Sequence, residues 1–482
     1  MADISYVCLS DTHFGAYNSL LTNLKTASEE VAPSRPSPVL LRLIDCLREL
    51  VHLNDDRDDR PTLVLNGDIL ELALATTNQA AMAFTRFMER VMPEDEGERL
   101  FDDIIFIPGN HDHHLWEIAR ETQYLNHIKQ LEPGSHLPVP WHATDMFVSQ
   151  STRTVPATFL MGLVNRLPHL SRKKKLITSF YPNYGIVSRN NGRAAFFHHG
   201  HFVEDLYKMM STARNMLYPE REPPKLPWDI EAENFAWIDF FWSAVGRSGD
   251  VGRDIGLLYE QIQNDEQRQR LVQNLSSSLA ERYDLPGWGD WMEARLLNWT
   301  FNLASRRIRN LERLQTTEQP LSEEAQQGLW DYIEGPLREQ VQVERNGNIP
   351  PDVSFIFGHT HKPFCEDYNF SGYPGWVDTY NTGGWVVDTV EPAPNHGAAV
   401  AVLDEELNSA AVRLYDEGAD ADSYEVRLQQ ASHPGEAANP LYEKLSAEID
   451  TSKDPWAAFS RQAATTVHKR GENLRRRRNS SS

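Results

Sequence analysis

Short apolar runs alternate with longer amphipathic segments in the first part of the chain. Residues 4–10, 62–66 and 104–107 are apolar runs of strand length, and polar residues follow each of them at once. Residues 38–53 and 80–92 lie between these runs and carry apolar side chains at helical spacing. Strands that alternate with crossover helices predict an α/β sheet covered by helices, with its ligands at the carboxyl ends of the strands.

The later elements follow a less regular pattern. Residues 114–130 predict a helix, and Asn190-Asn191-Gly192 is a strong turn signal between predicted strands at 185–188 and 193–197. The further predicted strands are 353–357, 377–380, 385–388, 398–403 and 410–415, with a hairpin turn at Asn381-Thr382-Gly383-Gly384. Helical periodicity recurs at 234–245, 255–275, 288–314 and 322–343. These last segments predict a helical cap that interrupts the core.

The pattern divides the chain into a core and its insertions. The predicted segments are core at 1–113, an insertion at 114–184, a core hairpin at 185–201, a helical cap at 202–350, core at 351–416 and a polar extension at 417–482. The extension ends in Arg475-Arg476-Arg477-Arg478, which predicts a basic mobile tail.

Composition narrows the class of protein. A hydrophobic fraction of 40% and an aromatic fraction of 10% are typical of a globular chain. The formal net charge of -22 makes nucleic acid an unfavourable partner, because the summed field repels polyanions. Cys8, Cys46 and Cys365 are widely spaced and odd in number, which favours a reducing compartment. No secretory leader or membrane span is visible, so we expect a cytoplasmic protein.

Polar motifs at the ends of the predicted strands carry the chemistry. They are Asp11-Thr12-His13, Gly67-Asp68, Gly109-Asn110-His111-Asp112, His199-Gly200-His201 and Gly358-His359-Thr360-His361. Alone, each has an ordinary interpretation: Asp11 or Asp68 would cap a helix, and His199 or His361 would be a polar loop residue. Together they supply the carboxylates, amide oxygens and imidazoles that hold divalent metals which activate water.

The combined motifs resemble those of the calcineurin-like metallophosphoesterases. The resemblance covers residues 4–112, 185–201 and 353–415, and it implies a four-layer αββα metallophosphoesterase sandwich with two divalent metal ions. The nitrogen and oxygen donors suit Mn first, with Fe, Zn or Co as alternatives. The implied metal ligands are Asp11, His13 and His361 for one ion, Asn110, His199 and His359 for the other, and Asp68 as the bridge. His198 is the alternative to His199.

The resemblance also implies a mechanism. A hydroxide that bridges the two metals would attack the phosphorus atom, without a covalent phospho-enzyme. His111 would stabilise the transferring phosphoryl group or protonate the leaving oxygen, and Asp112 would orient the ring of His111.

Residues 158–175 combine apolar side chains at helical spacing with the basic cluster Arg172-Lys173-Lys174-Lys175. The segment would make a peripheral membrane contact, form a lid over an anionic substrate, or pack on the core with a solvated end. Pro168 limits a continuous helix.

These features predict a metal-dependent hydrolase of a phosphoric ester or anhydride bond. The cap and the basic segment favour a small or lipid-linked phosphate as the substrate. One alternative is a phosphodiesterase or nuclease that acts on nucleic acid. The other is a non-catalytic scaffold with the same fold, although the chain keeps every ligand and the histidine that such a scaffold would be expected to lose.

Overall fold

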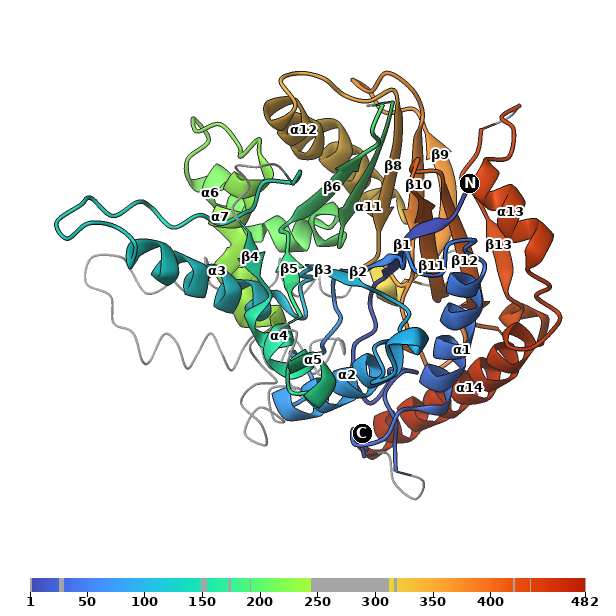
Figure 1. Cartoon of the computed structure of the whole chain (residues 1–482). Coiled ribbons are helices and arrows are strands. Elements are labelled where there is room, and N and C mark those ends of the chain that lie inside the picture. The colour runs from blue at the N-terminus through green and yellow to red at the C-terminus, as the bar shows by residue number, and fades with distance from the viewer. Residues whose placement is uncertain are drawn as a thin grey trace.

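The computed structural model describes residues 2–25, 30–148, 154–171, 175–190, 192–243, 312–315, 319–418, 421–433 and 435–481. Within them the chain forms a mixed α/β fold with two mixed β-sheets (Figure 1). This confirms the α/β class that the alternating pattern predicts. None of the described helices has both the length and the apolar character needed to cross a membrane.

The larger sheet has eight strands in the order β13-β12-β11-β1-β2-β3-β5-β4. They are β1 (Ile4–Leu9), β2 (Thr62–Asn66), β3 (Asp103–Ile107), β4 (Val155–Pro156), β5 (Ile177–Ser179), β11 (Gly397–Asp404), β12 (Ser409–Asp416) and β13 (Arg427–Gln429). Strands β1, β2, β3 and β5 are parallel, so their carboxyl ends meet at one edge. The predicted strands of this sheet are confirmed within a few residues.

The smaller sheet has five strands in the order β6-β7-β8-β10-β9. They are β6 (Asn183–Val187), β7 (Arg193–His198), β8 (Asp352–Phe357), β9 (Phe364–Tyr368) and β10 (Val377–Asn381). The hairpin predicted around Asn190 is confirmed, because β6 and β7 pair antiparallel. Strands β7, β8 and β10 are parallel, which brings the ends of β7 and β8 to one edge.

Helices cover the outer faces of the two sheets. They are α1 (Pro38–His52), α2 (Thr77–Val91), α3 (His113–Ile128), α4 (Thr158–Val164), α5 (Pro168–Ser171), α6 (Met209–Leu217), α7 (Pro227–Ile238), α11 (Glu323–Tyr332), α12 (Arg338–Glu344), α13 (Pro440–Glu448) and α14 (Trp456–Ser481). One apolar core joins the larger sheet to α1, α2, α4, α13 and α14, and another joins the smaller sheet to α7, α11 and α12. A third core lies between the sheets, so the layers run helix, sheet, sheet, helix (Figure 1).

Helix α1 shows how the local sequence builds these layers. Ser37 caps its first turn by accepting a hydrogen bond from the backbone N–H of Leu40 at 3.0 Å, and Pro38 suits the first helical position. The apolar face that the periodicity predicts, from Leu40 to Val51, is buried against the larger sheet.

The prediction of a hairpin between strands at 377–380 and 385–388 is wrong. Strand β10 pairs antiparallel with β9 instead. Gly383 has a φ of +66° and bridges to Ala398 of the larger sheet, and the backbone N–H of Trp385 donates to the carbonyl of Asp11. The Asn381–Gly384 turn therefore carries the chain from one sheet to the other rather than reversing it.

The basic mobile tail predicted for the end of the chain is also wrong. Helix α14 continues to Ser481 and packs against α1. Trp456, Phe459, Ala463 and Val467 are buried at helical spacing in the core of the larger sheet. The segment is polar on average because the apolar stripe of this amphipathic helix is narrow, so its composition did not indicate a packed helix.

The insertions contain helices as predicted, where they are described. Leu160, Val164 and Leu170 of α4 and α5 are buried in the core of the larger sheet, so these side chains are not presented to lipid. Arg172, Lys173 and Lys174 lie outside the described residues. The helix predicted at 322–343 is present as α11 and α12, joined by a π-helical turn. The predicted helix at 255–275, and residues 288–311 of the next one, also lie outside the described residues.

Candidate metal centre

The strand ends that meet at one edge carry a strained backbone. Asp11, His13, Asp68, His359 and His361 all have positive φ values, between +42° and +70°. Residues other than glycine rarely adopt this conformation, and such strain gathers at functional sites where the surrounding structure enforces it. Backbone hydrogen bonds hold two of these residues in place: the N–H groups of Asp11 and His13 donate to the carbonyls of Gly67 and Asp68 at 2.9 Å.

Glycines let the candidate ligands approach the neighbouring loops. A Cβ atom on Gly67 would lie 2.3 Å from Nδ1 of His199, and one on Gly358 would lie 2.1 Å from Oδ2 of Asp11. Any larger residue at either position would displace a candidate ligand. The Gly-Asp and Gly-His-Thr-His motifs therefore need their glycines for packing.

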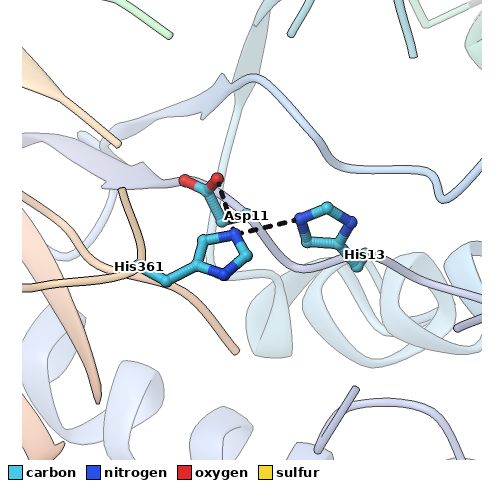
Figure 2. A group of neighbouring side chains, drawn as sticks. All are labelled: Asp11, His13 and His361. Carbon is cyan, nitrogen blue, oxygen red and sulfur yellow. Dashed lines mark hydrogen bonds and ion pairs between the residues drawn. The ribbon is translucent and has the colours of Figure 1, made fainter. Parts of the chain in front are cut away.

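The first group of candidate ligands is Asp11, His13 and His361 (Figure 2). Nε2 of His361 lies 3.4 Å from Oδ1 of Asp11 and 3.3 Å from Nε2 of His13. All three side chains are buried. The structure brings together the three residues predicted to bind one metal.

The second group is Asp68, His199 and His359, with Asn110 beside them. Nε2 of His199 lies 3.0 Å from Oδ1 of Asn110 and 3.3 Å from Nδ1 of His359. These residues include the three predicted to bind the other metal. His198 does not join them: its Nδ1 accepts the backbone N–H of Gly200.

Asp68 lies between the two groups. Its Oδ2 atom is 3.6 Å from Nε2 of His13 and 3.3 Å from Nε2 of His199, while its Oδ1 atom accepts the backbone N–H of His111 at 2.7 Å. One carboxylate oxygen thus faces a histidine of each group. This is the position that a bridging ligand requires.

The outward nitrogen of each histidine binds an oxygen. The pairs are His13 Nδ1 with Glu71 at 2.9 Å, His361 Nδ1 with Asp388 at 2.5 Å, His359 Nε2 with Glu204 at 2.7 Å, and His199 Nδ1 with the carbonyl of Asn66 at 3.2 Å. A ring nitrogen must donate its proton to each of these oxygens, which leaves a lone pair on the inward nitrogen of a neutral ring. Inward lone pairs 3.3 Å apart repel each other unless positive charge lies between them. The donor set therefore fits divalent metal ions, which lone pairs of imidazole and carboxylate bind.

The buried carboxylates of the centre also change the pKa values of the histidine rings. Burial disfavours a charged imidazole, but Asp68 and Asp11 outweigh it and raise the pKa of His199 to about 9. Burial is outweighed again at His361, where Asp388 and Asp11 raise the pKa to about 9. Burial opposes the ionisation of Asp68 too, yet His199 holds the pKa of this carboxyl well below its usual value. The cluster needs positive charge, from protons or from metal ions.

The structure assigns the orientation of His111 to Glu71 and not to Asp112. Oε1 of Glu71 lies 2.9 Å from Nδ1 of His111. The carboxylate of Asp112 instead accepts the backbone N–H groups of Gly109 at 2.7 Å, Ile69 at 2.7 Å and Leu70 at 3.2 Å. The prediction that Asp112 accepts a ring proton of His111 is wrong, because its side chain turns back to hold two loops together.

Several residues near the centre were not found from the sequence. Glu71 lies three residues after Asp68 on the same loop, so its place just beyond the Gly-Asp motif was an available signal. Asp388 and Glu204 lie close in sequence to other motifs, but nothing in their spacing marks them. Arg313, whose Nη1 atom lies 3.1 Å from Nε2 of His111, belongs to the cap and has no local signal.

Two other groups of His, Asp and Glu lie outside this centre among the described residues. In one, His113 binds Glu231 at 2.6 Å, and Arg120 pairs with Glu117. Burial opposes a charged His113, but Glu231 leads the neighbouring carboxylates in raising its pKa to about 10, so protonated His113 and Arg120 balance the carboxylates of this group. The other group is Asp367, His433 and Glu436 at the surface.

A comparison of the chain with protein-family models finds no match, and a comparison with curated proteins finds no similar sequence.

Proposed function

We propose that the chain is a calcineurin-like metallophosphoesterase that uses two divalent metal ions to hydrolyse a phosphoric ester or anhydride bond. The position of Asp68 carries the proposal, because one of its oxygens faces both groups of histidines. The helix, sheet, sheet, helix order of the layers and the placement of the motifs at one sheet edge support the same family.

The two groups have distinct ligand sets in this proposal. Asp11, His13 and His361 would hold one ion, and Asn110, His199 and His359 would hold the other, with Asp68 between them. Manganese is the first candidate, and iron, zinc or cobalt would suit the same nitrogen and oxygen donors. Bound together, two such ions activate water and neutralise charge on phosphoryl oxygens.

His111 is the residue placed for proton transfer. Glu71 holds its Nδ1 proton, which leaves a lone pair on Nε2, 3.1 Å from Nη1 of Arg313. Burial lowers the pKa of His111, against the opposing effect of Glu71, and the free ring is neutral. An anionic substrate adds the negative charge that favours proton uptake at Nε2, and Glu71 stabilises the imidazolium. The ring then donates this proton to the leaving oxygen.

The cap supports a small phosphorylated substrate over the alternatives. Tyr207 and Trp242 of the cap lie beside the centre, with ring centroids 5.1 Å from His359 and 6.3 Å from His111 respectively. Such walls suit a small phosphorylated molecule better than a duplex. A lipid-linked phosphate has weaker support, because the apolar side chains of α4 and α5 are buried.

Hydrolysis of p-nitrophenyl phosphate and of bis(p-nitrophenyl) phosphate, with Mn, Zn, Co or Fe supplied in turn, tests the proposal. We expect metal-dependent turnover by the wild-type protein that His111→Ala and Asp68→Ala reduce strongly. Asp45→Ala, on an exposed turn of α1, is the matched control. Turnover that neither variant changes, or a metal-loaded protein that hydrolyses neither ester, would refute the proposed enzymatic activity of this centre. The alternative of a non-catalytic scaffold would then remain.

A further inference from the structure

The C-terminal helix α14 places a buried arginine against the loop that follows the first motif of the centre. Arg470 is only 4% exposed. One nitrogen of its guanidinium, Nη2, donates to the backbone carbonyls of Ser19 at 3.1 Å and of Thr22 at 2.6 Å. Burial lowers the pKa of Arg470 to about 10. A buried charge that meets carbonyls instead of a carboxylate is costly, so packing alone does not account for an arginine here.

The loop that Arg470 contacts, residues 14–22, is irregular and mostly buried. The backbone groups of a buried loop must find hydrogen-bond partners outside regular secondary structure. Arg470 supplies a donor for two of the carbonyls from the far end of the chain. The conformation of the loop therefore depends on α14.

The side chains of the same two loop residues hold the backbone around Asp11 and His13. Oγ of Ser19 donates to the carbonyl of Thr12 at 2.8 Å, and Oγ1 of Thr22 accepts the backbone N–H two residues after His13 at 2.9 Å. Thr12 lies between Asp11 and His13, whose φ values are both positive. Because such a strained backbone persists only where its surroundings enforce it, these contacts help to place both ligands.

A second branch of contacts leads from the loop to His361. Nδ2 of Asn18 donates to the carbonyl of Val387 at 3.1 Å, and the backbone N–H of Val387 donates to the carbonyl of Asn18 at 3.2 Å. The next residue, Asp388, binds Nδ1 of His361 at 2.5 Å. Both branches therefore end at the first group of candidate ligands (Figure 2).

The second group of ligands is carried by other segments. Asn110, His199 and His359 follow strands β3, β7 and β8. The loop that Arg470 holds follows β1 instead. A change at Arg470 should therefore reach the first group more directly than the second.

We propose that Arg470 is a positioning residue for one metal ion of the centre. By holding residues 14–22 it keeps the first group of ligands at the spacing that a metal ion requires. A helix beyond the segments that carry the motifs thus takes part in the centre. The inference rests on the proposed function, because it assumes the two-metal centre, but it concerns metal affinity and not hydrolysis.

Calorimetric titration of the full-length, metal-free protein with MnCl₂ and with ZnCl₂ tests this inference, because it resolves the two ions and needs no substrate. Arg470→Met removes the donor but keeps most of the side-chain length, and Arg470→Lys restores a cationic donor. Arg475→Ala is the matched control, since Arg475 lies on the same helix and pairs with Glu391 at the surface. Val467→Ala, one turn before Arg470, removes buried packing from α14 and controls for a loss of stability.

We expect Arg470→Met to weaken the binding of one ion by about 10-fold and that of the other by less than about twofold. Arg470→Lys should recover most of the lost affinity, because a single nitrogen makes both hydrogen bonds in the wild type. Arg475→Ala and Val467→Ala should bind both ions as the wild type does, even where urea denaturation shows Val467→Ala to be less stable.

Double variants identify the ion. His361→Ala removes a ligand of the first group, and Asn110→Ala removes one of the second. Adding Arg470→Met to His361→Ala should not weaken the remaining ion further, because the two changes act on the same site. Adding it to Asn110→Ala should weaken the remaining ion by the same factor as in Arg470→Met alone.

Affinities in Arg470→Met within about twofold of the wild type would overturn the inference, as would an equal loss for both ions or an equal loss in Val467→Ala. Wild-type hydrolysis of either aryl ester together with any of these results would leave the proposed function standing. Dependence of one ion on Arg470, in a protein that hydrolyses neither ester, would uphold the inference and overturn the proposed activity. A wild-type protein that binds neither Mn²⁺ nor Zn²⁺ would overturn both.

Discussion

Nδ1 of His111 donates a hydrogen bond to Oε1 of Glu71 at 2.9 Å. The other oxygen of the same carboxylate lies 2.9 Å from Nδ1 of His13. One buried glutamate therefore fixes the rings of a candidate metal ligand and of the histidine proposed for proton transfer. In the proposed function, metal binding and proton transfer would both depend on this one side chain.

Replacement of Glu71 by Gln should impair catalysis more than stability. The amide can accept from one histidine but must present its NH₂ group to the other, so one of the two rings loses its orientation. We expect kcat/KM for the aryl monoester to fall by about 10- to 100-fold, as for other partners of metal-bound histidines. Glu49→Gln, on the exposed face of α1, should have no effect. Unchanged kinetics in Glu71→Gln would show that ring orientation is not limiting.

Replacement of Asp112 by Ala should act mainly on stability. Its buried carboxylate accepts three backbone N–H groups, which would be left without their acceptor. The expected loss is roughly 2–4 kcal/mol in the free energy of unfolding, measured by urea denaturation of metal-free protein. A catalytic defect in fully folded Asp112→Ala, with no loss of stability, would restore the direct role for Asp112 that the structure contradicts.

Metal binding should become more stabilising as pH rises from about 6.5 to about 9. In the metal-free protein the pKa values of His199 and His361 are raised to about 9, above the ordinary value of 6.5. Their protonation therefore stabilises the fold fully below pH 6.5, and this contribution is lost as pH rises through about 9. Metal must displace the same protons, so its advantage grows over this window.

Melting temperatures measured with EDTA and with excess MnCl₂ at several pH values test this linkage. The difference between the two melting temperatures should widen steadily toward pH 9. A difference that stays constant, or one that narrows with rising pH, would mean that protons and metal do not compete for these rings.

The end of the chain is predicted to stabilise the fold around the centre. Phe459 of α14 is fully buried and packs edge-on against Trp385 at 6.2 Å, and the backbone N–H of Trp385 donates to the carbonyl of Asp11. Phe459→Ala should lower the free energy of unfolding by about 3–5 kcal/mol. Arg461→Ala, an exposed position on the same helix, should change it by less than about 0.5 kcal/mol. Equal stability of the two variants would contradict the docking of α14.

The sequence predicted the candidate ligands because they follow directly after strands. Parallel strands bring their carboxyl ends to one edge, so Asp11, Asp68 and Asn110 had to lie near one another once the strands were recognised. The error at residues 385–388 has the opposite cause. A turn signal after a strand indicates that the chain changes direction, but only tertiary pairing decides whether it returns to the same sheet or crosses to another.

The surroundings of the centre could not be predicted in the same way. Arg313 is far in sequence from His111, and Glu204 is far from His359, so only the folded cap brings these pairs together. Asp112 shows a related limit. Because Asp112 is next to His111 in sequence, a contact between their side chains was expected. At a tight turn, however, neighbouring side chains point in different directions. The carboxylate of Asp112 accepts hydrogen bonds from buried backbone N–H groups instead.

The number of divalent metal ions bound per chain is the decisive test of a two-metal centre. It can be counted by elemental analysis of purified wild-type protein, of Asp68→Ala, and of Asp367→Ala from the separate surface group. We expect two ions per chain in the wild type and in Asp367→Ala, and the loss of at least one ion in Asp68→Ala, since its carboxylate faces both groups. A wild-type protein that binds no metal, or an Asp68→Ala variant that keeps both ions, would contradict it.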